Sequence, residues 1–125
     1  MYRSATPNAY RESAVLTASP VQLVVMLYDG ANRFLMKAIA LHEHGEPIRA
    51  NEPTQRAVAI VEELLATIDI ERGGEIAPRL QGIYVFCLKL MGEARYEQSP
   101  DKLRQVKDLL GELRESWATL AAQAG

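Results

Sequence analysis

The chain has 125 residues, of which 48% are hydrophobic and 24% are charged, and this is typical of one soluble globular domain with a core of its own. Its formal net charge of −2 at pH 7 argues against a nucleic-acid-binding protein, which would carry a basic patch. No apolar run approaches the roughly 20 residues that span a bilayer, and no secretion signal precedes the domain, so we predict a cytoplasmic protein without membrane insertion.

The first 18 residues differ in character from the rest of the chain. They are small and polar, with isolated larger side chains such as Tyr10. From residue 19 onward, helical periodicity dominates and alternating strand patterns are missing. We therefore predict a loosely ordered N-terminal arm at residues 1–18 and one helical domain at residues 19–125.

The first predicted helix runs from Pro20 to His44. Ser19 is a good N-cap, and Gln22 three residues later completes a capping box. Gly45 favours a helix end at this point. Past its start, this helix is apolar around most of its circumference, which is typical of a helix that is buried on two sides.

Three more helices follow, at about residues 54–70, 75–97 and 100–122. Pro53 is tolerated only in the first turn of the second helix, which favours Asn51 as its cap. Short connections between long helices make antiparallel neighbours. The predicted fold class is therefore all-α, an antiparallel up-down four-helix bundle.

Apolar residues at helical spacing define one core face on each helix. The predicted core residues include Leu23, Leu35, Leu64, Ile68, Ile76, Leu80, Cys87, Leu90, Leu103, Trp117 and Leu120. In the middle of the first helix, Gly30 predicts the close approach of a neighbouring helix, because glycine otherwise weakens a helix by up to about 1 kcal/mol. Asp29 lies at the margin of the core face, where we expect it to cap or to pair with a basic side chain.

A second set of apolar or small residues remains after the core faces are assigned, on the sides away from the core. Its members are Val21, Val25, Tyr28, Met36, Ile39, Ala59, Ala66, Val85, Leu88 and Tyr96. Together with Tyr10 of the arm, they are the predicted partner-binding residues. Large apolar patches usually mark interaction sites, but the pattern equally allows a partner groove, a homodimer interface or a wide core.

The chain shows no pattern typical of an enzyme. The Glu-x-x-His pairs of a di-iron bundle are missing, and His42 and His44 point to different sides of a helix end. Cys87 lies alone on an apolar face, which favours a buried small side chain. Gly73-Gly74 is better explained as a tight turn than as a phosphate site. We predict no catalytic residues, no metal and no cofactor.

Several segments, taken together and in order, resemble the flagellin export chaperone family of the FliS type. The resemblance covers nearly the whole chain, and its most specific parts are Met26-Leu27-Tyr28-Asp29-Gly30-Ala31 and Gly73-Gly74-Glu75-Ile76-Ala77. Further matching parts are Ala9-Tyr10, Ala18-Ser19-Pro20, Ile83-Tyr84 and Leu109-Leu110-x-x-Leu113 with Trp117.

The resemblance implies a cytoplasmic bundle that binds the C-terminal segment of flagellin, which is disordered when free. It also implies that capture prevents premature polymerisation and that the subunit is delivered to the flagellar type III export gate. In this family the N-terminal arm can lie over the groove, and some members also bind an anti-sigma factor.

Three alternatives to a flagellin chaperone stay open at this point. The chain could be a regulatory paralogue that binds an anti-sigma factor or another flagellar protein, because the same surfaces would serve it. It could be a homo-oligomeric structural bundle whose apolar stripes bury each other. A ligand- or metal-binding enzyme on the same fold is the third, and bound metal in the purified protein would favour it.

Overall fold

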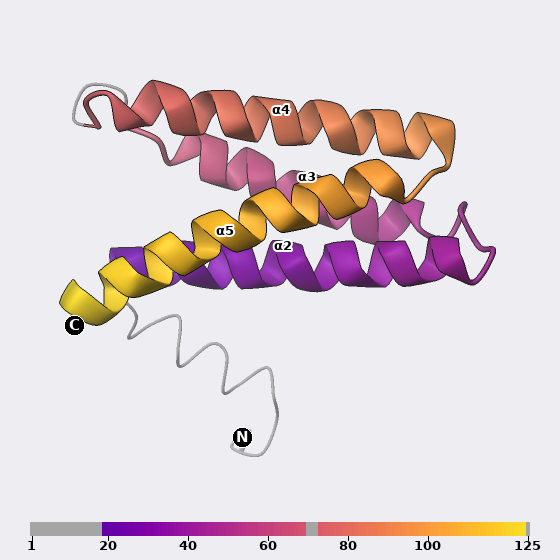
Figure 1. Ribbon diagram of the computed structural model, residues 1–125, viewed down its shortest axis with the longest axis horizontal. Helices are drawn as coiled ribbons and strands as arrows, with labels where there is room; N and C mark the ends of the chain where they lie inside the picture. Colours follow the sequence, from indigo (N-terminus) through magenta and orange to yellow (C-terminus); the bar gives the residue numbers. More distant parts are fainter. Residues whose placement is uncertain (1–18, 70–72, 125) are drawn as a thin grey trace, which may run out of the picture.

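The computed structural model describes residues 19–69 and 73–124, and these residues form four α-helices (Figure 1). The helices are α2 (Pro20–Glu43), α3 (Asn51–Ala66), α4 (Ile76–Glu97) and α5 (Asp101–Ala124). The predicted all-α four-helix bundle is thereby confirmed. The predicted N-terminal arm at residues 1–18 lies outside the described residues.

The four helices pack as a ring in chain order. α2 packs against α3 and α5, and α4 packs against the same two helices. In Figure 1, α5 runs obliquely across the bundle, from the end of α4 toward the start of α2. The bundle therefore has two unlike ends. We call the end where α2 and α4 finish the closed end, and the end where they begin the open end.

The start of α2 is as the sequence predicts. The Ser19 hydroxyl accepts the Gln22 backbone N–H at 3.2 Å, and the Gln22 side chain accepts the Ser19 backbone N–H at 2.8 Å. This is a complete capping box, which satisfies two N–H groups that a helix start leaves unpaired. The helix ends at Glu43, one residue before the predicted end, and Gly45 follows with a φ of 75°.

The prediction of Asn51 as the cap of α3 is wrong. Asn51 is the first helical residue, and Ala50 before it already has helical dihedral angles. The Asn51 backbone N–H donates to the Ile48 carbonyl, so the preceding turn supplies the partner that a side-chain cap would have offered. Pro53 lies in the first turn, as expected. The helix begins three residues earlier than predicted and ends at Ala66, so the predicted end at residue 70 is wrong. The Thr67 backbone N–H closes the last turn on the Glu63 and Leu64 carbonyls, and residues 68 and 69 are not helical.

The bounds of α4 and α5 fall within two residues of the prediction. α4 begins at Ile76 and ends at Glu97, where Gln98 adopts a left-handed conformation with a φ of 54°. α5 begins at Asp101, whose backbone N–H donates to the Ser99 hydroxyl at 3.4 Å. The tight turn between these helices makes α4 and α5 antiparallel neighbours, as predicted.

Small residues bring the helices together toward the closed end. Fully buried alanines occur on three of the helices and in the loop before α3: Ala31, Ala38, Ala50, Ala57 and Ala94. An alanine adds little bulk, so neighbouring backbones can approach closely. A similar close approach occurs at Gly30, where an added Cβ would lie 3.2 Å from the Ile60 Cδ1. This confirms the predicted role of Gly30.

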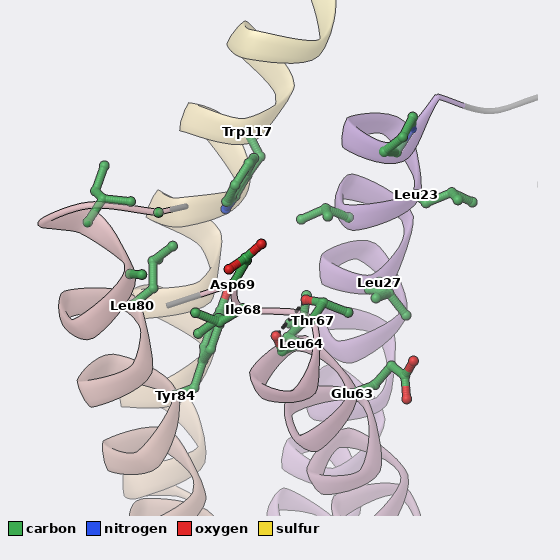
Figure 2. A pocket seen from close by; sticks show the side chains of 15 residues that line it. Leu23, Leu27, Glu63, Leu64, Thr67, Ile68, Asp69, Leu80, Tyr84 and Trp117 are labelled. Carbon is green, nitrogen blue, oxygen red and sulfur yellow. Dashed lines mark hydrogen bonds between the residues drawn. The ribbon is translucent and has the colours of Figure 1, made fainter. Parts of the chain in front are cut away.

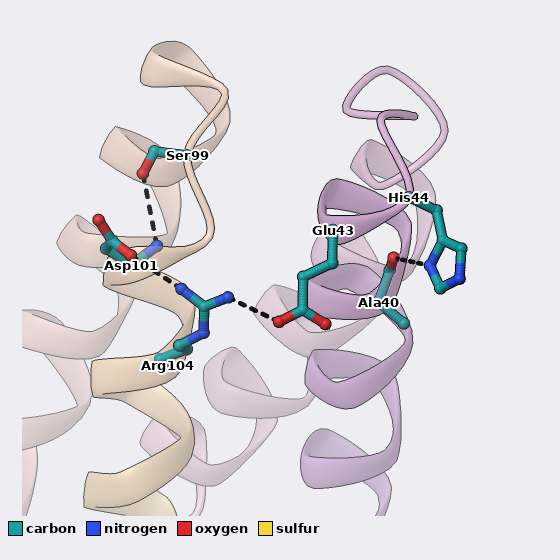
Figure 3. A network of polar contacts seen from close by, with 6 residues as sticks. All are labelled: Ala40, Glu43, His44, Ser99, Asp101 and Arg104. Atoms are coloured by element: carbon teal, nitrogen blue, oxygen red, sulfur yellow. Dashed lines mark hydrogen bonds and ion pairs between the residues drawn. The ribbon is translucent and has the colours of Figure 1, made fainter.

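Ion pairs link the helices at the closed end. The Arg104 guanidinium joins Asp101 on its own helix and Glu43 on α2, each at 2.8 Å (Figure 3). Lys102 binds Glu93 and Glu97 of α4, also at 2.8 Å each. These contacts link the start of α5 to the last turns of α2 and α4.

Candidate functional site

An apolar cleft with a volume of about 610 Å³ lies at the open end of the bundle. All four helices contribute to it. In Figure 2, Trp117 on α5 and Leu80 on α4 lie on one side, with Leu23 and Leu27 on α2 on the other. Its remaining lining residues are Pro20, Val24, Glu63, Leu64, Thr67, Ile68, Asp69, Gly73, Ile76, Ala77 and Tyr84. A recess of this size and character is typical of a binding site.

The course of α5 explains why this end is open. The cleft is lined by large apolar side chains such as Leu27, Ile68 and Trp117, together with the small residues Gly73 and Ala77. Because α5 leans toward the start of α2, its last turns diverge from α4 (Figure 1). Leu80 and Trp117 are consequently only half-buried, although they pack against the core.

Tyr84 lies at the floor of the cleft and forms a buried pair with Tyr28. Tyr28 of α2 and Tyr84 of α4 are 1% and 2% exposed, and their hydroxyl oxygens lie 2.5 Å apart in a hydrogen bond. Burial raises the pKa of Tyr28 far above its ordinary value, and the hydrogen bond with Tyr84 adds to this rise. Burial also raises the pKa of Tyr84. Both hydroxyls are therefore neutral at physiological pH.

A second recess of about 650 Å³ lies between α2 and α5 and is lined mostly by polar and charged residues, so we call it the polar recess. Its lining includes Tyr28, Asn32 and Lys107. An ion pair crosses it, in which the Arg114 guanidinium donates to both oxygens of Asp29, at 2.9 and 3.4 Å. This confirms the expectation that Asp29 pairs with a basic side chain.

Two of the predicted partner-binding residues are misplaced by the sequence pattern. Tyr28 and Ile39 were assigned to the side away from the core, and both are buried in it. The reason is that α2 packs against both α3 and α5, so its buried arc is wider than a single apolar face. The wide-core explanation therefore holds for these two residues.

The other predicted partner-binding residues lie on the surface or at its margin. Met36, Val85 and Tyr96 are exposed, and Tyr96 is the most exposed of them at 84%. Ala59 and Ala66 are exposed on α3. The half-buried members are Val21, Val25 and Leu88, and Leu88 packs against the core. Tyr10 lies outside the described residues.

None of these predicted residues that the structure describes lines the apolar cleft. Residues that the sequence assigned to the core do so instead, among them Leu23, Ile68 and Trp117. Two such assignments are wrong outright, since Ile76 and Leu120 are exposed. One signal in the sequence could have indicated this cleft. Bulky core-face residues lie near those helix ends that meet at the open end.

The described residues offer no group that suits metal or nucleophilic chemistry. Among them, no cluster of three or more His, Cys, Asp or Glu side chains could hold a metal ion. Cys87 is fully buried, and burial raises the pKa of its thiol to about 11, which keeps it protonated and unreactive. No helix within the described part of the chain is long and apolar enough to cross a membrane.

An open apolar groove between helices is one of the arrangements in which proteins bind an amphipathic segment of another polypeptide. The model of the FliS family, described as "Flagellar protein FliS", matches residues 2–124. The chain belongs to this family of flagellar secretion chaperones and is not an enzyme.

Curated relatives support the assignment over nearly the full length. The chain is 34% identical to the flagellar secretion chaperone FliS of Salmonella typhimurium, over 99% of this chain and 96% of that protein. It is 33% identical to the Campylobacter jejuni protein of the same name, over 88% and 86%. The Bacillus subtilis FliS is 28% identical, over 88% and 81%.

Proposed function

We propose that this protein is a cytoplasmic chaperone that binds the C-terminal segment of flagellin and delivers it to the flagellar type III export gate. While bound, the segment cannot take part in premature polymerisation. The proposal rests on membership of a flagellar secretion chaperone family together with the open apolar cleft. Binding of flagellin, of the gate and of an anti-sigma factor are separate expectations, and flagellin is the one for which the cleft is best suited.

The cleft has the properties that an amphipathic helix or an apolar extended segment requires. Its walls carry leucine, isoleucine and tryptophan side chains, and its acidic residues Glu63 and Asp69 are exposed. Partners that bind such grooves place a row of apolar anchors into them. A segment that is disordered when free can order itself as it buries these anchors.

We infer that the cleft is the anchor point and that exposed residues outside it extend the track. The exposed predicted residues Met36, Val85 and Tyr96, with Ala59 and Ala66 on α3, are the proposed extension. A wrapped segment would thereby contact more than one helix. Because the residues of the extension stay partly in water, each should contribute less to affinity than a residue of the cleft.

Isothermal titration calorimetry with the C-terminal segment of flagellin from the same organism tests this function. We expect saturable one-to-one binding with a large negative heat-capacity change, because coupled folding and binding buries about 1,000–3,000 Å². A folded, monomeric protein that gives no heat of binding would contradict the proposal. It would direct attention to an anti-sigma factor as the partner, whereas a stable dimer would indicate a structural bundle.

A further inference from the structure

Tyr28 and Tyr84 have two hydroxyl hydrogens but share only one hydrogen bond, so one hydrogen has no acceptor within the pair. A phenolic hydroxyl donates one hydrogen bond and accepts up to two. Tyr28 and Tyr84 share one hydrogen bond, which uses one of their two hydrogens. Among the described residues, no further acceptor receives the second hydrogen.

The position of the pair determines where this spare hydrogen can go. Tyr84 lines the apolar cleft, and Tyr28 lines the polar recess between α2 and α5. On the closed-end side of the pair, Ala31 and Cys87 are fully buried. The hydrogen therefore faces the cleft if Tyr28 is the donor of the shared bond, and the recess if Tyr84 is the donor.

Either hydroxyl can donate the shared hydrogen bond. An acceptor that enters the cleft selects the arrangement in which Tyr28 donates to Tyr84, because only then is the Tyr84 hydrogen free for the acceptor. In that arrangement each hydrogen bond polarises the next.

We infer that Tyr84 is a specificity-determining residue, which donates a hydrogen bond from the floor of the cleft to a carbonyl oxygen of the bound segment. This inference rests on the proposed function. The acceptor is a main-chain carbonyl that no helix uses, at a helix C-terminus or in an extended stretch, or the side-chain carbonyl of Asn or Gln.

Such a donor would fix the register of the bound segment. Apolar walls accept many sequences at similar affinity, because apolar contacts have little direction. A buried hydroxyl that finds no acceptor is costly, so a segment that places only apolar atoms on the floor is penalised. The cleft thus selects a segment with apolar anchors and one free carbonyl between them.

Two single substitutions separate this role from a structural one. Tyr84→Phe removes the donor from the cleft floor, whereas Tyr28→Phe leaves the Tyr84 hydroxyl free to donate. Both lose the shared hydrogen bond, so their stabilities should fall alike, which urea denaturation checks. We expect Tyr84→Phe to weaken calorimetric binding of the flagellin C-terminal segment by about 3- to 10-fold, and Tyr28→Phe by less than about 2-fold.

The double variant Tyr28→Phe/Tyr84→Phe keeps the test decisive if Tyr84→Phe folds poorly. It contains no unpaired hydroxyl, so its stability should recover, yet it should bind as weakly as Tyr84→Phe. Trp117 is the sole tryptophan of the chain and lines the cleft, so its fluorescence reports binding there independently.

Each outcome decides the inference. Equal weakening by both single substitutions would assign a merely structural role to the pair and overturn it. Unchanged affinity of Tyr84→Phe would overturn it as well. If the wild-type protein does not bind the segment, the proposed function fails and this inference with it, which is distinct from a failure confined to the substitutions.

Discussion

The two ends of the bundle are made of the same four helices, yet they differ in how far those helices approach. At the closed end, alanines such as Ala50 and Ala94 let the helices meet, and Arg104 and Lys102 link them. At the open end, α5 diverges from α4 and an apolar cleft lies between the helices. We propose that the closed end stabilises the fold and that the open end binds the partner.

The largest expected difference between the two regions concerns the loss of a leucine side chain. Leu35 of α2 is fully buried, and Leu23 of the same helix lines the cleft and is half-buried. Truncating a buried leucine costs about 3 kcal/mol, from lost burial and from the cavity left behind. We expect Leu35→Ala to lower the free energy of unfolding by about that amount.

Leu23→Ala is the matched change at the cleft, and it should lower the free energy of unfolding by only about 1 kcal/mol, since part of the side chain is already in water. Urea denaturation followed by circular dichroism measures both variants. Equal losses would show that the open end carries as much of the stability as the packed core.

Alkaline pH should destabilise the folded protein through two buried groups, the Tyr28 hydroxyl and the Cys87 thiol. Burial raises the pKa of Cys87 to about 11 and raises that of Tyr28 as well. A raised pKa means that the folded protein keeps a proton that the unfolded chain releases. Stability is therefore complete below the unfolded values of about 8.5 for Cys and 10 for Tyr, and it falls as pH rises through them.

The slope of this loss is at most about 1.4 kcal/mol per pH unit for each such group. Urea denaturation at a series of pH values between about 8 and 11 measures it. Cys87→Ala is the control, because it should flatten the curve between about pH 9 and 11. A variant with an unchanged slope would assign the loss to other groups.

The ion pair beside the polar recess should contribute modestly. Asp29→Asn removes the charge that the Arg114 guanidinium contacts, and both side chains are more than one-third exposed. Exposed pairs contribute at most about 1 kcal/mol, and salt screens them. Thermal unfolding should show a small decrease at low ionic strength that shrinks as salt is added. A loss that salt does not change would indicate a packing role for Asp29.

The smallest expected effect is a gain in stability. Gly82 lies on the exposed side of α4 with open space around an added Cβ. Gly82→Ala should raise the free energy of unfolding by about 0.5–1 kcal/mol, because alanine favours the helix. Gly30→Ala is the matched control, where the Ile60 methyl at 3.2 Å should offset the gain. A larger gain at Gly30 would mean that α2 and α3 separate easily.

Local signals in the sequence predict the fold well. Capping and periodicity placed the start of α2 at Pro20 and the bounds of α4 and α5 within two residues. The error at Asn51 arose because a loop turn, rather than a side chain, starts α3. Such a turn depends on the path of the whole loop, which spacing does not encode.

The candidate site was harder to predict than the fold. Periodicity tells which residues share a helix face but not whether the facing helix is near, so Leu80 and Trp117 looked like ordinary core. It also assumes one buried face per helix, which misplaced Tyr28 and Ile39 on the two-sided helix α2. The hydrogen bond between Tyr28 and Tyr84 joins residues 56 positions apart, so no local sequence pattern predicts it.

Binding of the flagellin C-terminal segment to two variants of α4 tests the role of the cleft most directly. Leu80→Glu places a charge inside the cleft, and Tyr96→Glu places the same charge on the exposed face of the same helix. Circular dichroism confirms that each variant is folded, and Leu23→Gln serves as a second cleft variant. We predict that calorimetric affinity falls at least about 10-fold for the cleft variants and less than about 3-fold for Tyr96→Glu. An equal or larger loss from Tyr96→Glu would contradict the account and move the anchor point to the outer face of α4.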